Sequence, residues 1–203
     1  MEGIIQYLKD TYDPISILVY GSYLRGDYDE YSDFDCTVIV EDDDKTATYD
    51  YSIVNGVQLD CIIFSRKEAL WAKHPSEFVK MHNAQIIIDD GTAKTMLEHL
   101  HEYMDETAII SDDRRREITS WIIKMTNRFD RDGTDGDYSI IFFLWQSLLL
   151  YCRLRGLFYC GPKETMSYLK DNDSLGYELA NMALGDKSVT ATTAWANYII
   201  GIT

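Results

Sequence analysis

An apolar run that stops at a glycine and a serine sets the first constraint on this fold. Residues 15–20 read Ile-Ser-Ile-Leu-Val-Tyr, a run typical of a buried strand. The strand meets Gly21-Ser22, and such a turn can bring backbone N–H groups and a hydroxyl close to a phosphate. The stretch therefore predicts a strand that ends at an anion-binding turn.

Two acids follow this turn after ten further residues. From Asp33 to Val40 apolar residues alternate with others, so Asp33 and Asp35 share the face opposite the apolar one. Carboxylates placed side by side repel each other, and a hard divalent cation would remove that repulsion. The pattern predicts a metal site next to the phosphate-binding turn.

A third acid stands in a predicted hairpin. Residues 49–64 read as two strands joined by Asn55-Gly56, a dipeptide typical of a two-residue turn. Asp60 interrupts the second, otherwise apolar strand, and a carboxylate in a buried strand is costly without a partner. A metal ion shared with the first two acids would be that partner.

Taken in order, Gly-Ser, ten residues, Asp-x-Asp and a lone Asp on a later strand resemble the nucleotidyltransferase superfamily, which includes DNA polymerase beta. The nearest resemblance is to small bacterial members, the aminoglycoside (kanamycin-type) nucleotidyltransferases. Those proteins also place a helical bundle after the catalytic domain, so the resemblance in domain order covers most of the chain.

The resemblance implies transfer of a nucleoside monophosphate from a nucleoside triphosphate, with ATP as the expected donor, to a hydroxyl. It also implies two Mg²⁺ ions about 3.5–4 Å apart. Asp33 and Asp35 would ligate both ions, and Asp60 the ion that activates the acceptor hydroxyl. Gly21 and Ser22 would hold the triphosphate.

Two further residues match the family at single positions. Arg25 falls where kanamycin-type enzymes carry an arginine near the phosphates, and a surface charge is the competing interpretation. Glu117 is the nearest match to the acidic residue that takes the acceptor proton in those enzymes. Its competing interpretation is a surface acid paired with a neighbouring arginine.

The net charge of −15 bears on the acceptor. A groove for nucleic acid must present Lys and Arg to phosphates, so this charge argues against a nucleic-acid substrate. It favours a cationic, hydroxyl-rich small molecule such as an aminoglycoside, which would make the protein an antibiotic-resistance enzyme. Two alternatives stay open: an enzyme that modifies a protein hydroxyl, and a catalytically silent nucleotide sensor or antitoxin-like partner.

The order of the predicted elements indicates an α+β protein with two domains. Residues 1–108 are expected to form the catalytic domain, a mixed sheet with flanking helices, and residues 109–203 a helical bundle. Within the first domain we predict one helix over Lys67 to Asn83 that buries Trp71, among others. Within the second, residues 133–136 are predicted to be a loop.

The expected setting is the cytoplasm. The N-terminus lacks the basic and apolar stretches of a signal peptide, and the longest apolar run, residues 140–152, is too short to span a bilayer. No membrane partner is therefore expected. Because a second subunit completes the cleft in kanamycin-type enzymes, the resemblance also implies a homodimer.

Overall fold

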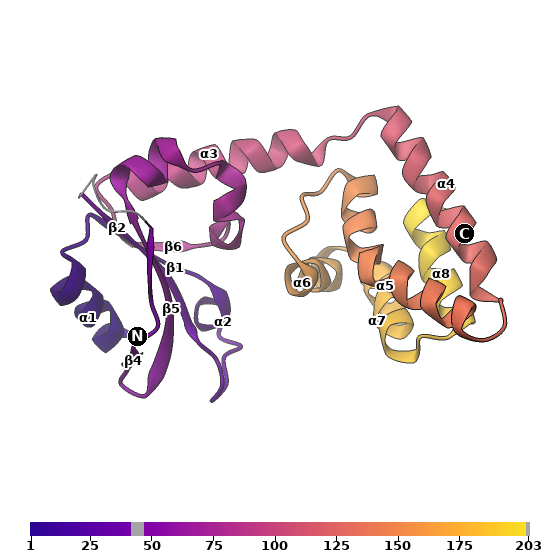
Figure 1. Ribbon diagram of the computed structural model, residues 1–203, viewed down its shortest axis with the longest axis horizontal. Coiled ribbons are helices and arrows are strands. Elements are labelled where there is room, and N and C mark those ends of the chain that lie inside the picture. The colour runs from indigo at the N-terminus through magenta and orange to yellow at the C-terminus, as the bar shows by residue number, and fades with distance from the viewer. Residues whose placement is uncertain (42–46, 202–203) are drawn as a thin grey trace. The chain divides into compact units, whose positions relative to one another are not determined.

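The computed structural model describes residues 1–41 and 47–201 (Figure 1). Its contacts divide the chain into two compact units, Met1–Tyr103 and Met104–Thr203. The division falls within one long helix, α3 (Thr92–Ala108). Each unit has its own buried apolar cluster.

The first unit is built on a mixed sheet with the strand order β3-β5-β2-β1-β6, and β4 pairs with β5. Strands β2 and β5 are parallel, and the other pairs are antiparallel. This is the predicted mixed sheet with flanking helices. Its elements are α1 (Glu2–Tyr12), β1 (Ser16–Val19), α2 (Gly21–Arg25), β2 (Phe34–Val40), β3 (Thr48–Asp50), β4 (Ile53–Val54), β5 (Val57–Ser65) and β6 (Gln85–Ile88).

Alternation along the strands gives this sheet two apolar faces. One face packs against α1, whose buried residues Ile4, Ile5 and Leu8 join the same cluster as Phe34 and Cys36. The other face meets the segment after β5. There Phe64 lies edge-on to Phe78 with ring centroids 5.4 Å apart, and the Thr37 hydroxyl lies 3.5 Å from the sulfur of Met81. Asp35 and Asp60 lie on this second face, near its end. Asp35 is two residues from Thr37 on β2, Asp60 is four residues from Phe64 on β5, and residues an even number of positions apart on a strand lie on the same face.

The single helix predicted over residues 67–83 is wrong. The chain instead forms a π-helix, η1 (Glu68–Ala72), and then a 3₁₀-helix, η2 (Pro75–Met81). Proline has no backbone N–H and forces the residue before it into extended conformation, so the first helix cannot continue through His74. Trp71, predicted to be buried, is 77% exposed.

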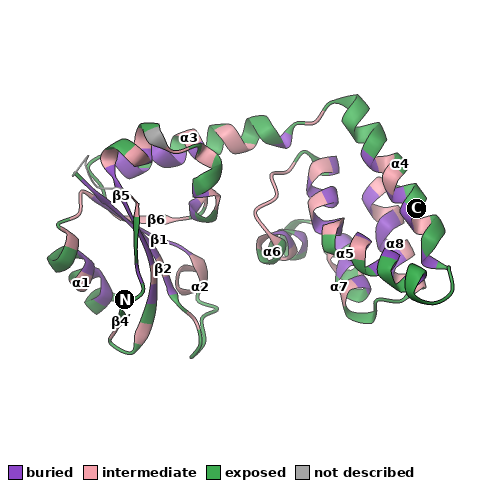
Figure 2. Ribbon diagram, in the orientation of Figure 1, coloured by how far each residue is buried: buried purple, intermediate pink, exposed green. Residues whose placement is uncertain are grey.

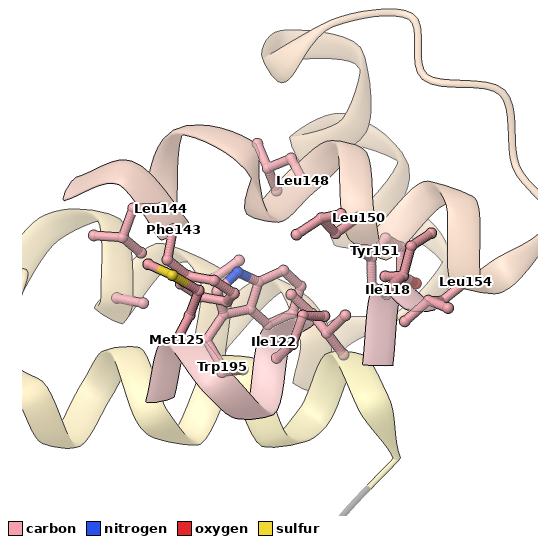
Figure 3. Close-up of a cluster of buried hydrophobic side chains, with 14 of the residues drawn as sticks. Ile118, Ile122, Met125, Phe143, Leu144, Leu148, Leu150, Tyr151, Leu154 and Trp195 are labelled. Atoms are coloured by element: carbon pink, nitrogen blue, oxygen red, sulfur yellow. The ribbon is translucent and has the colours of Figure 1, made fainter. Parts of the chain in front are cut away.

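The regular elements that the structure describes in the second unit are all helices, as predicted. Its helices are α4 (Asp112–Phe129), α5 (Thr134–Arg155), α6 (Pro162–Asn172), α7 (Ser174–Asp186) and α8 (Val189–Ile200). Buried and exposed positions alternate along α4 with helical period (Figure 2), and its buried side chains join those of α5 and α8 around the fully buried Trp195 (Figure 3). None of the helices described here combines the length and the apolar content needed to cross a membrane.

The loop predicted at residues 133–136 is shorter than expected. Helix α5 already begins at Thr134, and Gly136 lies in its first turn. A Cβ at Gly136 would lie 2.1 Å from the backbone oxygen of Arg131. The glycine therefore allows the close approach that starts the helix, and it is not a loop residue.

Candidate active site

The turn after β1 is shaped around one carboxylate. Gly21 opens α2 with a φ of +73°, a conformation that a residue with a side chain rarely adopts. A Cβ at Gly21 would lie 2.0 Å from Oδ2 of Asp35 and 2.7 Å from its Cγ. The backbone N–H of Tyr20 donates to the backbone oxygen of Asp35 at 3.1 Å, which fixes the turn to β2. Glycine is therefore required here so that the Asp35 carboxylate can lie directly against the turn.

A second carboxylate lies beside the first. Asp35 on β2 and Asp60 on β5 are direct neighbours in the parallel register, so their side chains lie on the same face. Burial raises the pKa of the Asp35 carboxyl, and the charge of Asp60 raises it further. The exposed Asp33, which immediately precedes β2, adds to this effect. The structure thus places Asp35 where unneutralised negative charge accumulates.

A lysine partly offsets that charge. Nζ of Lys80, on η2, lies 3.3 Å from Oδ2 of Asp60 and 5.6 Å from the centre of the Tyr20 ring. Its positive charge lowers the pKa of Asp35. Sequence reasoning missed Lys80 because it treated residues 67–83 as one continuous helix. Two features of the sequence could have indicated Lys80: the carboxylate of Asp60 needs a partner of opposite charge, and Pro75 interrupts the predicted helix.

The remaining predicted residues lie around this centre or in the other unit. The backbone oxygen of Ser22 accepts from the N–H of Gly26 at 2.9 Å, which closes α2. Arg25 is exposed, lies 3.3 Å from Asp27, and lowers the pKa of Asp35 through its charge. Glu117 belongs to the second unit, where it lies on α4, is exposed, and pairs with Arg114 at 2.8 Å.

The donor chemistry suits a hard cation. Mg²⁺ prefers carboxylate and phosphate oxygens, and half-buried carboxylates that repel each other gain from a divalent charge more than from one lysine. Within residues 1–41 and 47–201, no three His, Cys, Asp or Glu side chains are close enough together to form a metal site by themselves. The carboxylates of this site that could ligate a metal are those of Asp35 and Asp60, with Asp33 immediately before β2.

Comparison with known proteins agrees with the acidic motif. Residues 1–129 match the model of the nucleotidyltransferase domain family, a range that runs from the first residue to the end of α4. Among solved structures, a nucleotidyltransferase-like protein from Exiguobacterium sibiricum is similar, with 14% identity and a TM-score of 0.41 over 98% of this chain and 75% of that chain. No curated protein matches.

Proposed function

Because the chain belongs to the nucleotidyltransferase domain family, we propose that it transfers a nucleoside monophosphate from a nucleoside triphosphate to a hydroxyl. One observation carries the proposal: the Asp35 carboxylate lies against the Gly21 turn and beside Asp60. A turn that offers backbone N–H groups to phosphate, next to acids that attract a divalent cation, is the pair of features that such a reaction needs.

In the proposed reaction the acceptor oxygen attacks the α-phosphorus of the triphosphate. The bond from this phosphorus to the β-phosphate bridging oxygen breaks, pyrophosphate leaves, and the hydroxyl proton passes to a base. Magnesium bound at the site would neutralise phosphate charge and make the acceptor hydroxyl more acidic. Gly21 and Ser22 would bind the phosphates, and Asp33, Asp35 and Asp60 would hold the cation.

Lys80 has a positioning role in this proposal. Its ion pair with Asp60 spans β5 and η2, so it holds the carboxylate on the sheet face beside Asp35. It also reduces the cost of keeping both acids ionised before metal and nucleotide bind. Glu117 is the proposed general base, and its pairing with Arg114 would have to open for it to take a proton.

The proposed donor is ATP with Mg²⁺, and the proposed acceptor is a small cationic molecule with hydroxyl groups, such as an aminoglycoside. The support is electrostatic, because a chain of net charge −15 attracts cations at long range and the attraction weakens with salt. The proposed enzyme works as a homodimer, as in the kanamycin-type proteins that the sequence resembles.

The test follows the labelled phosphate. Purified protein is incubated with Mg²⁺ and with ATP labelled at either the α- or the γ-phosphate, together with aminoglycosides, lincosamides or whole-cell protein. We expect label from the α-position alone, no transfer by Asp35→Asn, and normal transfer by Asp10→Asn, an exposed acid on α1. The acceptor that becomes labelled identifies the class.

Three results would contradict parts of the proposal. Transfer of the γ-label would show a kinase and not a nucleotidyltransferase. Triphosphate binding without any transfer would favour the silent sensor. Label on protein alone, with a rate independent of salt, would leave nucleotidyl transfer standing and remove the cationic acceptor.

A further inference from the structure

A basic pocket lies within the second unit, between α4 and α5. Its volume is about 550 Å³, and its charged lining residues are Arg114, Arg116, Glu117, Lys124 and Arg153. Four cations against one acid give a local charge of +3 (4 − 1), in a chain whose net charge is −15. The pocket therefore has the charge opposite to that of the molecule as a whole.

Two of these cations are available to a ligand. Arg114 pairs with Glu117 at 2.8 Å, and Arg116 pairs with Asp113. Lys124 and Arg153, in contrast, make no ion pair or side-chain hydrogen bond with any residue that the structure describes. The acid that lines the pocket, Glu117, is paired with Arg114, so the charges of Lys124 and Arg153 have no ion pair within the described part of the chain to offset their mutual repulsion. An anion between them would remove that cost.

The α4 helix adds to the positive potential. Arg114 and Arg116 lie in its first two turns, where the helix dipole favours acids and disfavours cations. The neighbouring Asp113 and Glu117 offset this cost only by exposed pairing, which contributes little to stability. Arg114 and Arg116 therefore place positive charge at the start of α4, where these side chains contribute little to the stability of the fold.

One wall of the pocket is aromatic and fixed in place. The Trp121 ring packs against Phe142 and Phe143, with centroid distances of 6.1 and 6.4 Å, and Ile118 and Leu150 are buried beside it. A flat apolar wall next to unpaired cations suits a molecule with a ring at one end and a phosphate at the other. The volume lies in the range of small-molecule sites, which is about 300–1,000 Å³.

We propose that this pocket binds a phosphorylated small molecule of nucleotide size. Lys124 and Arg153 contact its phosphate oxygens, with the planar guanidinium able to contact two of them, and its ring lies against Trp121. Glu117, the proposed general base, also lines this pocket and is paired there with Arg114, and the molecule proposed here has a charge opposite to that of the proposed acceptor. All residues that line the pocket belong to the second unit, whereas the acids proposed to hold the metal belong to the first.

The test measures binding of AMP to the full chain by titration calorimetry, in EDTA so that no metal is present at the acids of the first unit. Parallel titrations use inorganic phosphate, pyrophosphate and adenosine. The Trp121 indole N–H resonance, assigned with Trp121→Phe, reports whether the ligand reaches the aromatic wall. We expect AMP to bind more tightly than phosphate or adenosine, to shift this resonance, and to bind more weakly as salt rises.

The variants locate the binding. The double variant Lys124→Gln/Arg153→Gln should weaken AMP binding about tenfold or more, because two charge-assisted contacts are lost. Lys170→Gln/Lys187→Gln, the same charge change elsewhere in this unit, should leave it unchanged, as should Asp35→Asn. No binding of any phosphate probe, equal binding by the two double variants, or loss of binding in Asp35→Asn would each overturn the proposal. Since no turnover is measured, failure of the proposed enzyme activity leaves this test intact.

Discussion

Substituting Gly21 by alanine tests how closely the turn and the Asp35 carboxylate depend on each other. A φ of +73° costs a residue with a side chain about 1–2 kcal/mol. The new methyl group would also lie 2.0 Å from Oδ2 of Asp35, so that carboxylate must leave its position. Forcing a side chain off its preferred rotamer costs about 0.5–1.5 kcal/mol. The total loss of folding stability is therefore about 1.5–3.5 kcal/mol.

Gly26 is the matched control. It has a φ of +80°, and a Cβ there would meet no atom within 4 Å, so Gly26→Ala carries the backbone cost alone. Urea denaturation should give a loss of about 1–2 kcal/mol for Gly26→Ala and a larger loss for Gly21→Ala. Nucleotidyl transfer should fall about a hundredfold or more in Gly21→Ala alone, because displacing a positioned group by about 1 Å can cost that much.

A double-mutant cycle isolates the collision between these two side chains. In Asp35→Ala the carboxylate is absent and the nearest remaining side-chain atom, the Cβ of residue 35, lies 3.0 Å from the position of the new methyl group. Gly21→Ala should therefore cost less stability in Asp35→Ala than in the native protein. If Gly21→Ala and Gly26→Ala lose equal stability and equal activity, the Gly21 turn does not position Asp35 and the reasoning fails.

Three further predictions concern stability and pH. Thr192 is fully buried and its hydroxyl has no hydrogen-bond partner among the described residues, so Thr192→Val should stabilise the protein by about 1 kcal/mol in urea denaturation. Thr165→Val is the control and should destabilise the protein, because it removes a hydroxyl that donates to a backbone oxygen 2.8 Å away. Burial would raise the pKa of Asp173, but two tyrosine hydroxyls and a backbone N–H that donate to its carboxylate lower the pKa overall. The ionised carboxylate therefore contributes its full stabilisation above the unfolded pKa of about 3.9, and this stabilisation is lost as pH falls through the lowered pKa. Asp173→Asn should accordingly flatten the acid limb of a stability–pH curve. Lys80→Met should raise the pKa of Asp35 further. The pH below which Mg²⁺ no longer raises the melting temperature should therefore increase. If this pH is the same in Lys80→Met and the native protein, Lys80 is not electrostatically coupled to the site.

Sequence patterns predicted the parts of the site that depend on local periodicity. The alternation predicted strands that carry Asp35 and Asp60, whereas the parallel pairing of β2 with β5, which makes these two residues direct neighbours, was not predicted. The hairpin turn at Asn55 and Gly56, with φ angles of +53° and +82°, follows equally directly from the residue types.

The features that sequence analysis missed depend on contacts between distant segments. Lys80 reaches Asp60 because Pro75 divides the predicted helix and turns η2 toward the sheet. Trp71 is exposed for the same reason, since the π-helix that carries it ends before η2 begins. The close contact between Gly21 and Asp35 was also out of reach, because a positive φ and a carboxylate position cannot be derived from the identity of the glycine alone.

Counting bound Mn²⁺ by electron paramagnetic resonance tests the central claim most directly, with a nonhydrolysable triphosphate present. The account predicts that the native protein binds two ions, that Asp35→Asn binds none tightly, and that Asp60→Asn loses one of the two. Asp10→Asn, an exposed acid outside the site, should bind like the native protein. Unchanged Mn²⁺ binding in Asp35→Asn and Asp60→Asn would contradict the assignment of these acids to a metal–nucleotide site.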